Sequence, residues 1–209
     1  TGVSNVIMGY ATGDALTDAD YNVAIGATAL TSDTKGGRSV AVGYGSLTLQ
    51  NFTTATDTYN TAVGYQAGNV LTTGINNTLI GGLSGDALTT GEFSVAMGYN
   101  ALGSETAATR SVAIGASALR DQNVGGGTTT YNTAVGHIAG FAVTTGIYNT
   151  LIGGAAGDAL TDADFNTAVG VQALTSDTLG SRSTAVGYAA LSNQNFSTTA
   201  TNVYNVAMG

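Results

Sequence analysis

Apolar and polar positions recur along the whole chain in one five-residue phrase, [Asn/Ser]-x-[Ala/Leu/Ile]-[Val/Ile/Met]-Gly, which occurs twelve times in 209 residues. Eight of the intervals between successive copies are 17 residues, two are 21 and one is 22. A 17-residue unit is therefore nested in a 72-residue super-repeat of four units, which indicates a repeat architecture. The closing glycines are Gly9, Gly26, Gly43, Gly64, Gly81, Gly98, Gly115, Gly136, Gly153, Gly170, Gly187 and Gly209.

A unit of 17 residues is too short for a pair of helices. Its Gly, Thr, Asn and β-branched residues favour short strands and turns instead. We therefore expect each unit to form one coil of a parallel β-solenoid, with two strands of four or five residues and two turns. Coils that stack about 4.8 Å apart would make a rod about 55 Å long. The predicted fold is all-β, in a single repeat domain over residues 1–209.

The third unit of each super-repeat has four or five extra residues, near 51–58, 123–130 and 195–203. These additions do not fit a coil, so we expect bulge loops on one side of the rod. Repeated loops could contact a receptor or a glycan multivalently, although a merely tolerated bulge is the simpler interpretation. The candidate contact residues are Asn51, Phe52, Asn123, Asn195 and Phe196.

All ten tyrosines fall in two columns, one before the opening Asn/Ser and one after the closing Gly. Stacked coils would turn these columns into ladders of aromatic rings, which favour offset stacking. Three arginines recur at 72-residue spacing in the first column, and we expect them to offset the Asp-rich turns. They are Arg38, Arg110 and Arg182.

Successive side chains of a strand point to opposite faces, so the Ala and Val of the phrase face opposite ways. Small Ala, with Leu16, Leu30, Leu47 and Leu71, would fill the thin coil. The other face then carries an apolar stripe, at roughly 1.5–3 kcal/mol per side chain if fully buried, which predicts a partner surface. A dimer, a trimer or a sheet-like assembly would each cover it. The stripe, a candidate oligomer core, comprises Met8, Ile25, Val42, Val63, Ile80, Met97, Ile114, Val135, Ile152, Val169, Val186 and Met208.

Composition excludes several function classes. A net charge of −8 with five basic residues argues against nucleic-acid binding and against anionic membranes. The chain has no apolar run long enough to insert into a membrane, and no cysteine. The single histidine, His137, stands in a column of Tyr, Ala and Gly, where it indicates no catalytic arrangement. We therefore expect no enzyme activity and no cofactor.

Acidic turns offer one alternative to a chain without cofactors. The segment GDALTDAD occurs at 13–20 and again at 157–164, and alternate aspartates can offer oxygen ligands to Ca²⁺. Solvated turn aspartates that oppose edge-to-edge association of rods are the preferred interpretation. The Ca²⁺ candidates are Asp14, Asp18, Asp20, Asp158, Asp162 and Asp164.

The phrases NVAIGATAL (22–30), NTAVGYQAG (60–68) and SVAIGASAL (111–119) resemble the head repeats of trimeric autotransporter adhesins and the repeats of phage tail fibres. This resemblance implies a left-handed parallel β-roll, a homotrimer with the aliphatic residue of the phrase facing the trimer axis, and an extracellular location on a virion or a bacterial cell. It implies a structural or adhesive fibre segment. Since the chain begins and ends within the phrase, we expect a fragment of a longer fibre.

Two alternatives remain for the function. A free-standing β-solenoid that binds ice or a glycan would fit the Thr-rich composition, although most Thr residues are expected in turns and bulges. A polysaccharide-degrading tailspike would need an acidic pair at one level of the rod, and the acidic clusters recur instead.

Overall fold

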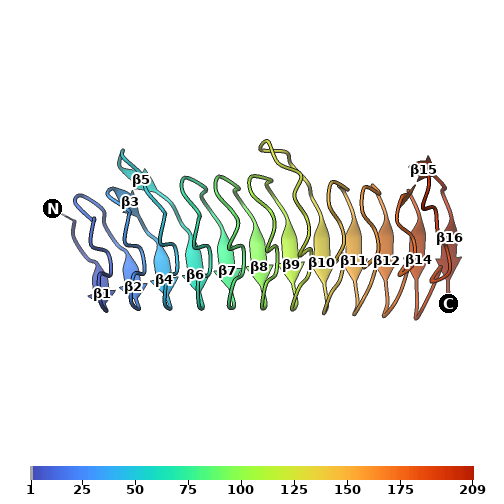
Figure 1. Cartoon of the computed structure of the whole chain (residues 1–209), viewed down its shortest axis with the longest axis horizontal. Coiled ribbons are helices and arrows are strands. Elements are labelled where there is room, and N and C mark those ends of the chain that lie inside the picture. Colours follow the sequence, from blue (N-terminus) through green and yellow to red (C-terminus); the bar gives the residue numbers. More distant parts are fainter. Residues whose placement is uncertain (1) are drawn as a thin grey trace.

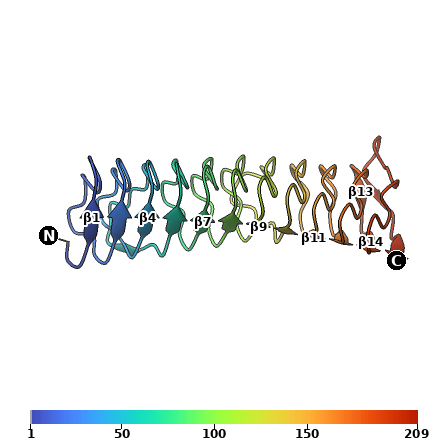
Figure 2. The same cartoon turned by 90° about the horizontal axis from the view of Figure 1, so that it is seen from below.

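The computed structural model describes residues 2–209 as one rod of twelve coils (Figure 1). Each coil contributes one three-residue strand to a 12-stranded parallel sheet that runs the length of the rod (Figures 1 and 2). No helix occurs in the described residues, so the expected all-β parallel β-solenoid is confirmed. The sheet strands are β1 (Val6–Met8), β2 (Val23–Ile25), β4 (Val40–Val42), β6 (Thr61–Val63), β7 (Thr78–Ile80), β8 (Val95–Met97), β9 (Val112–Ile114), β10 (Thr133–Val135), β11 (Thr150–Ile152), β12 (Thr167–Val169), β14 (Thr184–Val186) and β16 (Val206–Met208). We number the coils 1 to 12 by these strands.

Each residue of the phrase pairs with its own copy in the next coil, for example Val23 with Val40. The register is kept where the intervening segment has extra residues, since Val40 pairs with Thr61. Figure 1 shows the longer segments 51–58 and 123–130, and the region of β15, projecting from the side of the rod opposite the sheet.

The expectation of two strands in every coil is wrong. Second strands occur in the described residues as two short pairs at the first and third insertions. They are β3 (Gly36–Gly37) with β5 (Thr56–Asp57), and β13 (Gly180–Ser181) with β15 (Thr201–Asn202).

Three columns of left-handed backbone explain why the rest of each coil stays irregular. The residue before the opening Asn/Ser has φ of +49° to +67° in every coil, as at Tyr21 and Arg38. The second and fourth residues after the closing glycine are also left-handed, as at Thr28 and Leu30. Residues in this region turn the chain and cannot continue a strand.

The closing glycines allow the coils to approach closely. A Cβ on Gly64 would lie 2.5 Å from the carbonyl oxygen of Gly81, and the φ of Gly64 is +142°. Glycine alone adopts such a conformation without strain. The Gly of the phrase is therefore required by the stacking itself.

The interior holds small apolar side chains and a polar ladder. The middle residue of nearly every sheet strand is fully buried, as are Leu30, Leu47 and Leu71. The opening Asn or Ser also points inward: Asn22 donates from Nδ2 to the carbonyl oxygen of Gly36 (2.9 Å) and accepts from the amide of Ser39 (2.8 Å). Since buried polar groups need partners, this ladder lets a polar residue recur in every coil.

The first and third residues of each sheet strand lie on the outer face. Those of the inner coils are mostly half-buried against their neighbours, whereas Met8 and Met208 at the two ends are 63% and 80% exposed. The described part of the chain contains no helix that is long and apolar enough to cross a membrane.

Candidate functional site at the first bulge loop

A buried carboxylate holds the start of the first bulge loop. Asp33 is fully buried; its Oδ1 accepts from the amides of Gly36 (2.9 Å) and Phe52 (3.0 Å), and its Oδ2 accepts from Nε2 of Gln50 (2.6 Å). Gly36 belongs to the same coil, whereas Phe52 opens the insertion of the next coil. Asp33 therefore joins the loop to the coil beneath it.

Gln50 continues this connection into the rod. Its Nε2 also donates to Oγ of Ser39 (2.8 Å), and its Oε1 accepts from Nδ2 of Asn60 (2.9 Å). Ser39 is short and leaves room for the longer glutamine. Gln50 thereby connects Ser39 to Asn60, the ladder residue of the next coil. A chain of satisfied buried hydrogen bonds of this kind rigidifies its surroundings.

The same arrangement recurs under the other two insertions. Glu105 accepts from Gln122 (3.2 Å) and from the amide of Val124 (3.2 Å). Asp177 accepts from Gln194 (2.5 Å) and from the amide of Phe196 (2.9 Å). Sequence reasoning missed these six residues. They share a pattern that could have indicated them: each stands seven positions after a closing glycine, and the fourth position after the same glycine is always Leu.

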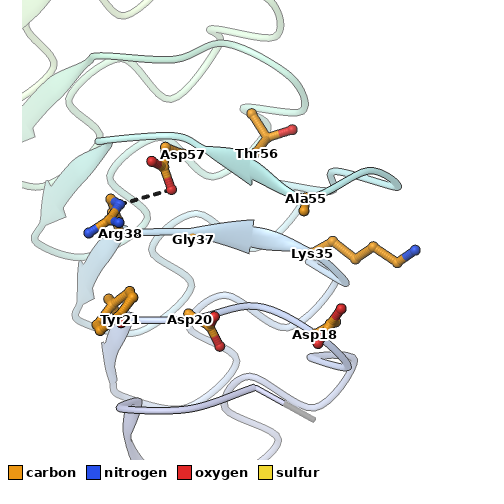
Figure 3. A pocket seen from close by; sticks show the side chains of 9 residues that line it. All are labelled: Asp18, Asp20, Tyr21, Lys35, Gly37, Arg38, Ala55, Thr56 and Asp57. Atoms are coloured by element: carbon orange, nitrogen blue, oxygen red, sulfur yellow. Dashed lines mark ion pairs between the residues drawn. The ribbon is translucent and has the colours of Figure 1, made fainter.

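A groove of about 340 Å³ lies beside the first loop (Figure 3). Figure 3 shows Tyr21 and Arg38 at the end next to the sheet and Lys35 extending at the outer rim. The groove is lined by Asp18, Asp20, Tyr21, Lys35, Gly37, Arg38, Ala55, Thr56 and Asp57.

The Arg38 side chain is held by an ion pair and by two aromatic rings. Its Nε lies 2.9 Å from Oδ1 of Asp57, and its guanidinium stacks between the rings of Tyr21 (4.8 Å) and Tyr59 (6.0 Å). The hydrogen bond with Asp57, together with the charge of Asp57, raises the pKa of Arg38.

The arginine side chains bond to the loop segments. Asp57 lies in the bulge loop, and the equivalent Arg110 and Arg182 donate to Oγ1 of Thr129 (3.1 Å) and Oδ1 of Asn202 (3.0 Å), also in the loop segments. The reason is the parallel stacking, which sets each arginine beside the insertion that follows it by about 20 residues.

The aromatic columns stack as expected. Ring centroids are 5.5 Å apart for Tyr44 and Tyr65, 5.7 Å for Tyr131 and Tyr148, and 4.9 Å for Tyr148 and Phe165.

The candidate loop-contact residues differ in exposure. Asn51, Asn123 and Asn195 are exposed, and Phe196 is half-buried. Phe52 is only 9% exposed. The expectation that it contacts a receptor is therefore wrong. Its amide is held by Asp33, which turns the side chain into the body of the rod.

The candidate calcium ligands are not brought together. Within residues 2–209, no group of three or more His, Cys, Asp or Glu side chains is placed to hold a metal ion. Asp20 and Asp164 instead accept from the backbone amides of Val3 (2.7 Å) and Ile147 (2.7 Å). Asp158 and Asp162 accept from Thr hydroxyls of neighbouring coils, while Asp14 and Asp18 are exposed. Four of these aspartates therefore connect neighbouring coils, and the six do not form a common metal site in the described residues.

Comparison with known families identifies the repeat. The family model for the YadA head domain repeat matches two segments, residues 85–101 and 179–198. These two segments are similar to YadA-type head repeats. Each segment spans parts of two coils. The first contains the sheet strand β8 and the second contains β14. The match agrees with the resemblance of the repeated phrases and points to an adhesin-type surface protein.

No curated protein and no solved structure matches the chain.

Proposed function

We propose that this chain is a structural and adhesive segment, shaft or head, of an extracellular fibre in which three copies pack around a common axis. The outer face of the 12-stranded sheet would face that axis, and the bulge loops would face outward. The resemblance to the YadA-type repeat supports the trimer and the left-handed roll. The apolar outer face of this chain independently supports an assembly that covers this face.

The observation that carries the proposal is the apolar outer face of the 12-stranded sheet, which no other part of the rod covers. At every level of the sheet the outward residues are Thr or Val in the first column and Val, Ile or Met in the third. Ile152 and Met97, within the rod, are still 39% and 36% exposed. A continuous exposed apolar face indicates a surface for a partner.

The other side of the rod suits contact with the outside. The bulge loops project opposite the sheet, so a common axis along the sheet would leave all of them accessible (Figure 1). Three copies would multiply each loop threefold, which favours multivalent attachment. The repeat match supports an adhesin-type surface segment, on a bacterial cell or on a virion. We propose no catalytic role and no cofactor.

The mass in solution, measured by light scattering on a size-exclusion column, tests the assembly. We expect about three times the chain mass of 20.6 kDa. The double variant Val135→Asp/Ile152→Asp places charges on the outer face and should reduce the mass toward one chain, because carboxylates would be desolvated at the axis.

The control is Thr54→Asp, which adds a charge to an exposed position of the first bulge loop and should leave the mass unchanged. A wild-type chain with the mass of a monomer would contradict the trimer. So would a double variant that keeps the trimer mass.

One observation favours the ice-binding alternative. Six sheet strands begin with an outward Thr, and Thr133, Thr150, Thr167 and Thr184 form an unbroken column. The Thr residues are therefore less confined to turns than we expected. Thermal hysteresis of a monomeric chain would favour this function, whereas a trimer would cover the column.

A further inference from the structure

We propose that Asn51 and Asn195, in the first and third bulge loops, are acceptor sites for N-linked glycosylation. Each is the first residue of an Asn-x-Thr/Ser sequon, NFT at 51–53 and NFS at 195–197. Enzymes that attach sugar to asparagine recognise this tripeptide, and its use requires that it lies on an accessible surface. The inference goes beyond the proposed fibre and does not require the trimer, because a single rod exposes the same two asparagines.

The first loop presents both polar residues of its sequon to solvent. Asn51 and Thr53 are exposed, whereas Phe52 between them is buried. The amide of Phe52 donates to Oδ1 of Asp33 (3.0 Å), and its carbonyl oxygen accepts from the amide of Lys35 (3.0 Å). Phe52 therefore anchors the tripeptide to the rod and leaves the asparagine and the hydroxyl at the surface.

The nitrogen that would accept the sugar is available. Oδ1 of Asn51 accepts from Oγ1 of Thr34 (3.2 Å), whereas Nδ2 of Asn51 has no hydrogen-bond partner among residues 2–209. In the transfer from a nucleotide-activated sugar, Nδ2 loses a proton to a base of the enzyme and bonds to the anomeric carbon. The bond from that carbon to the diphosphate oxygen breaks, and the nucleoside diphosphate leaves with the electron pair.

The third loop repeats this arrangement. The amide of Phe196 donates to Oδ1 of Asp177 (2.9 Å), and its carbonyl oxygen accepts from the amide of Leu179 (2.8 Å). Asn195 and Ser197 are exposed on either side of it. Both sequons thus occupy the same place in the super-repeat, away from the 12-stranded sheet (Figure 1). Sugars attached there would leave the strand pairing and the apolar outer face undisturbed.

Two other asparagines show what a site requires. Asn123 is exposed at the equivalent place in the second loop, but Gly125 stands where a sequon has Thr or Ser. A further sequon, NNT at 76–78, lies within the rod. Asn76 is half-buried, and Thr78 begins β7 and pairs with the strands on both sides. Asn123 therefore lacks the hydroxyl of the sequon, and Asn76 lacks the accessibility.

Transfer of glucose from UDP-glucose to the folded, full chain tests the proposal. The enzyme is a soluble bacterial N-glycosyltransferase that recognises Asn-x-Thr/Ser, and intact mass with peptide mapping measures the product at each asparagine. We expect hexose on Asn51 and Asn195 and none on Asn123. Transfer to Asn76 should be at least tenfold slower than transfer to Asn51, because the sheet holds Thr78.

Thr53→Ala removes the hydroxyl of the first sequon and should reduce transfer to Asn51 at least tenfold, with transfer to Asn195 unchanged. Thr54→Ala is the matched control, because it removes the same group from the next exposed residue of the loop, outside the sequon. It should accept hexose like the wild type. Circular dichroism of both variants verifies that they are folded.

The proposal is overturned if neither Asn51 nor Asn195 accepts hexose, or if Asn123 or Asn76 accepts it as fast as Asn51. It is also overturned if Thr53→Ala and Thr54→Ala behave alike. The light-scattering mass of the chain decides the trimer separately, since a monomer exposes the same loops.

Discussion

Coil 5 and coil 2 share the same strand phrase and the same register, but their interiors are built differently. In coil 5 the fourth residue after the closing glycine is Gly85 and the seventh is Leu88. In coil 2 the fourth is Leu30 and the seventh is Asp33. The leucine of coil 2 thus stands three positions earlier than that of coil 5, and the seventh position of coil 2 holds a carboxylate.

Packing explains the exchange. A Cβ on Gly85 would lie 2.8 Å from Cδ2 of Leu79 and 2.9 Å from Cδ1 of Leu88, so the apolar coil has no room for a second leucine. In the polar coil Leu30 fills the centre, and Asp33 is free to bind the backbone of its own turn and of the next insertion. Both arrangements keep the interior full.

The difference shows where the rod can tolerate extra residues. In all three super-repeats the insertion follows a buried acid and a glutamine, and the first amides of the insertion find their acceptor in that acid. An insertion after an apolar coil would leave such amides without a partner. The polar coils are thus the attachment points of the bulge loops.

The largest expected effect is that of Asp33→Ala. It removes the acceptor of two buried amides and of Nε2 of Gln50, and we expect a loss of about 4 kcal/mol in the free energy of unfolding. Urea unfolding at fixed protein concentration would measure it. Thermolysin should also cleave near Phe52, because the loop loses its anchor.

Asp121→Ala is the control for Asp33→Ala, since Asp121 pairs with Arg120 at the surface (2.7 Å) and should cost less than about 1 kcal/mol. Equal losses for the two variants would remove the distinction between buried and surface acids.

Leu88→Ala makes the corresponding change in an apolar coil. The lost contacts and the cavity should cost about 3 kcal/mol in the same urea experiment. In contrast to Asp33→Ala, the pattern of thermolysin fragments from the bulge loops should stay unchanged. Cleavage near Phe52 in this variant would mean that any loss of stability loosens the loop.

Exchange of the pair tests whether Asp33 and Gln50 act together. Asp33→Asn brings two amide groups into contact and should cost about 1–2 kcal/mol. Adding Gln50→Glu restores a donor and an acceptor in the reverse direction, so the double variant should recover most of the loss. A double-mutant cycle without coupling would contradict a direct hydrogen bond between the two side chains.

The smallest expected effect is that of Asp86→Asn. Burial raises the pKa of Asp86 above its ordinary value of 3.8, and its Oδ1 has no hydrogen-bond partner. A raised folded-state pKa means that protonation stabilises the fold. This contribution is complete below about pH 3.8 and is lost as the pH rises through the raised folded-state value.

The substitution should therefore raise stability by a few tenths of a kcal/mol at pH 7 and have less effect near pH 3, as measured by thermal unfolding at the two pH values. Asp158→Asn is the control, because Asp158 accepts from Oγ1 of Thr175 (2.5 Å). A similar gain in both variants would point to net charge as the cause.

The stacked architecture could be predicted from the repeated phrase. A 17-residue phrase with alternating apolar positions allows equivalent residues to pair only in a parallel, in-register stack, and it predicts that Ala faces inward. The aromatic columns and the positions of the insertions followed from the same alignment of units.

The tertiary structure alone decided the polar interior and the groove. Left-handed residues in each coil break the alternation, so the phrase does not reveal that Asp33 and Gln50 point inward. The partner of Arg38 lies 19 residues further along, in an insertion that has no counterpart in most coils. Local sequence carries little information about such contacts, because each is formed between coils and not within one.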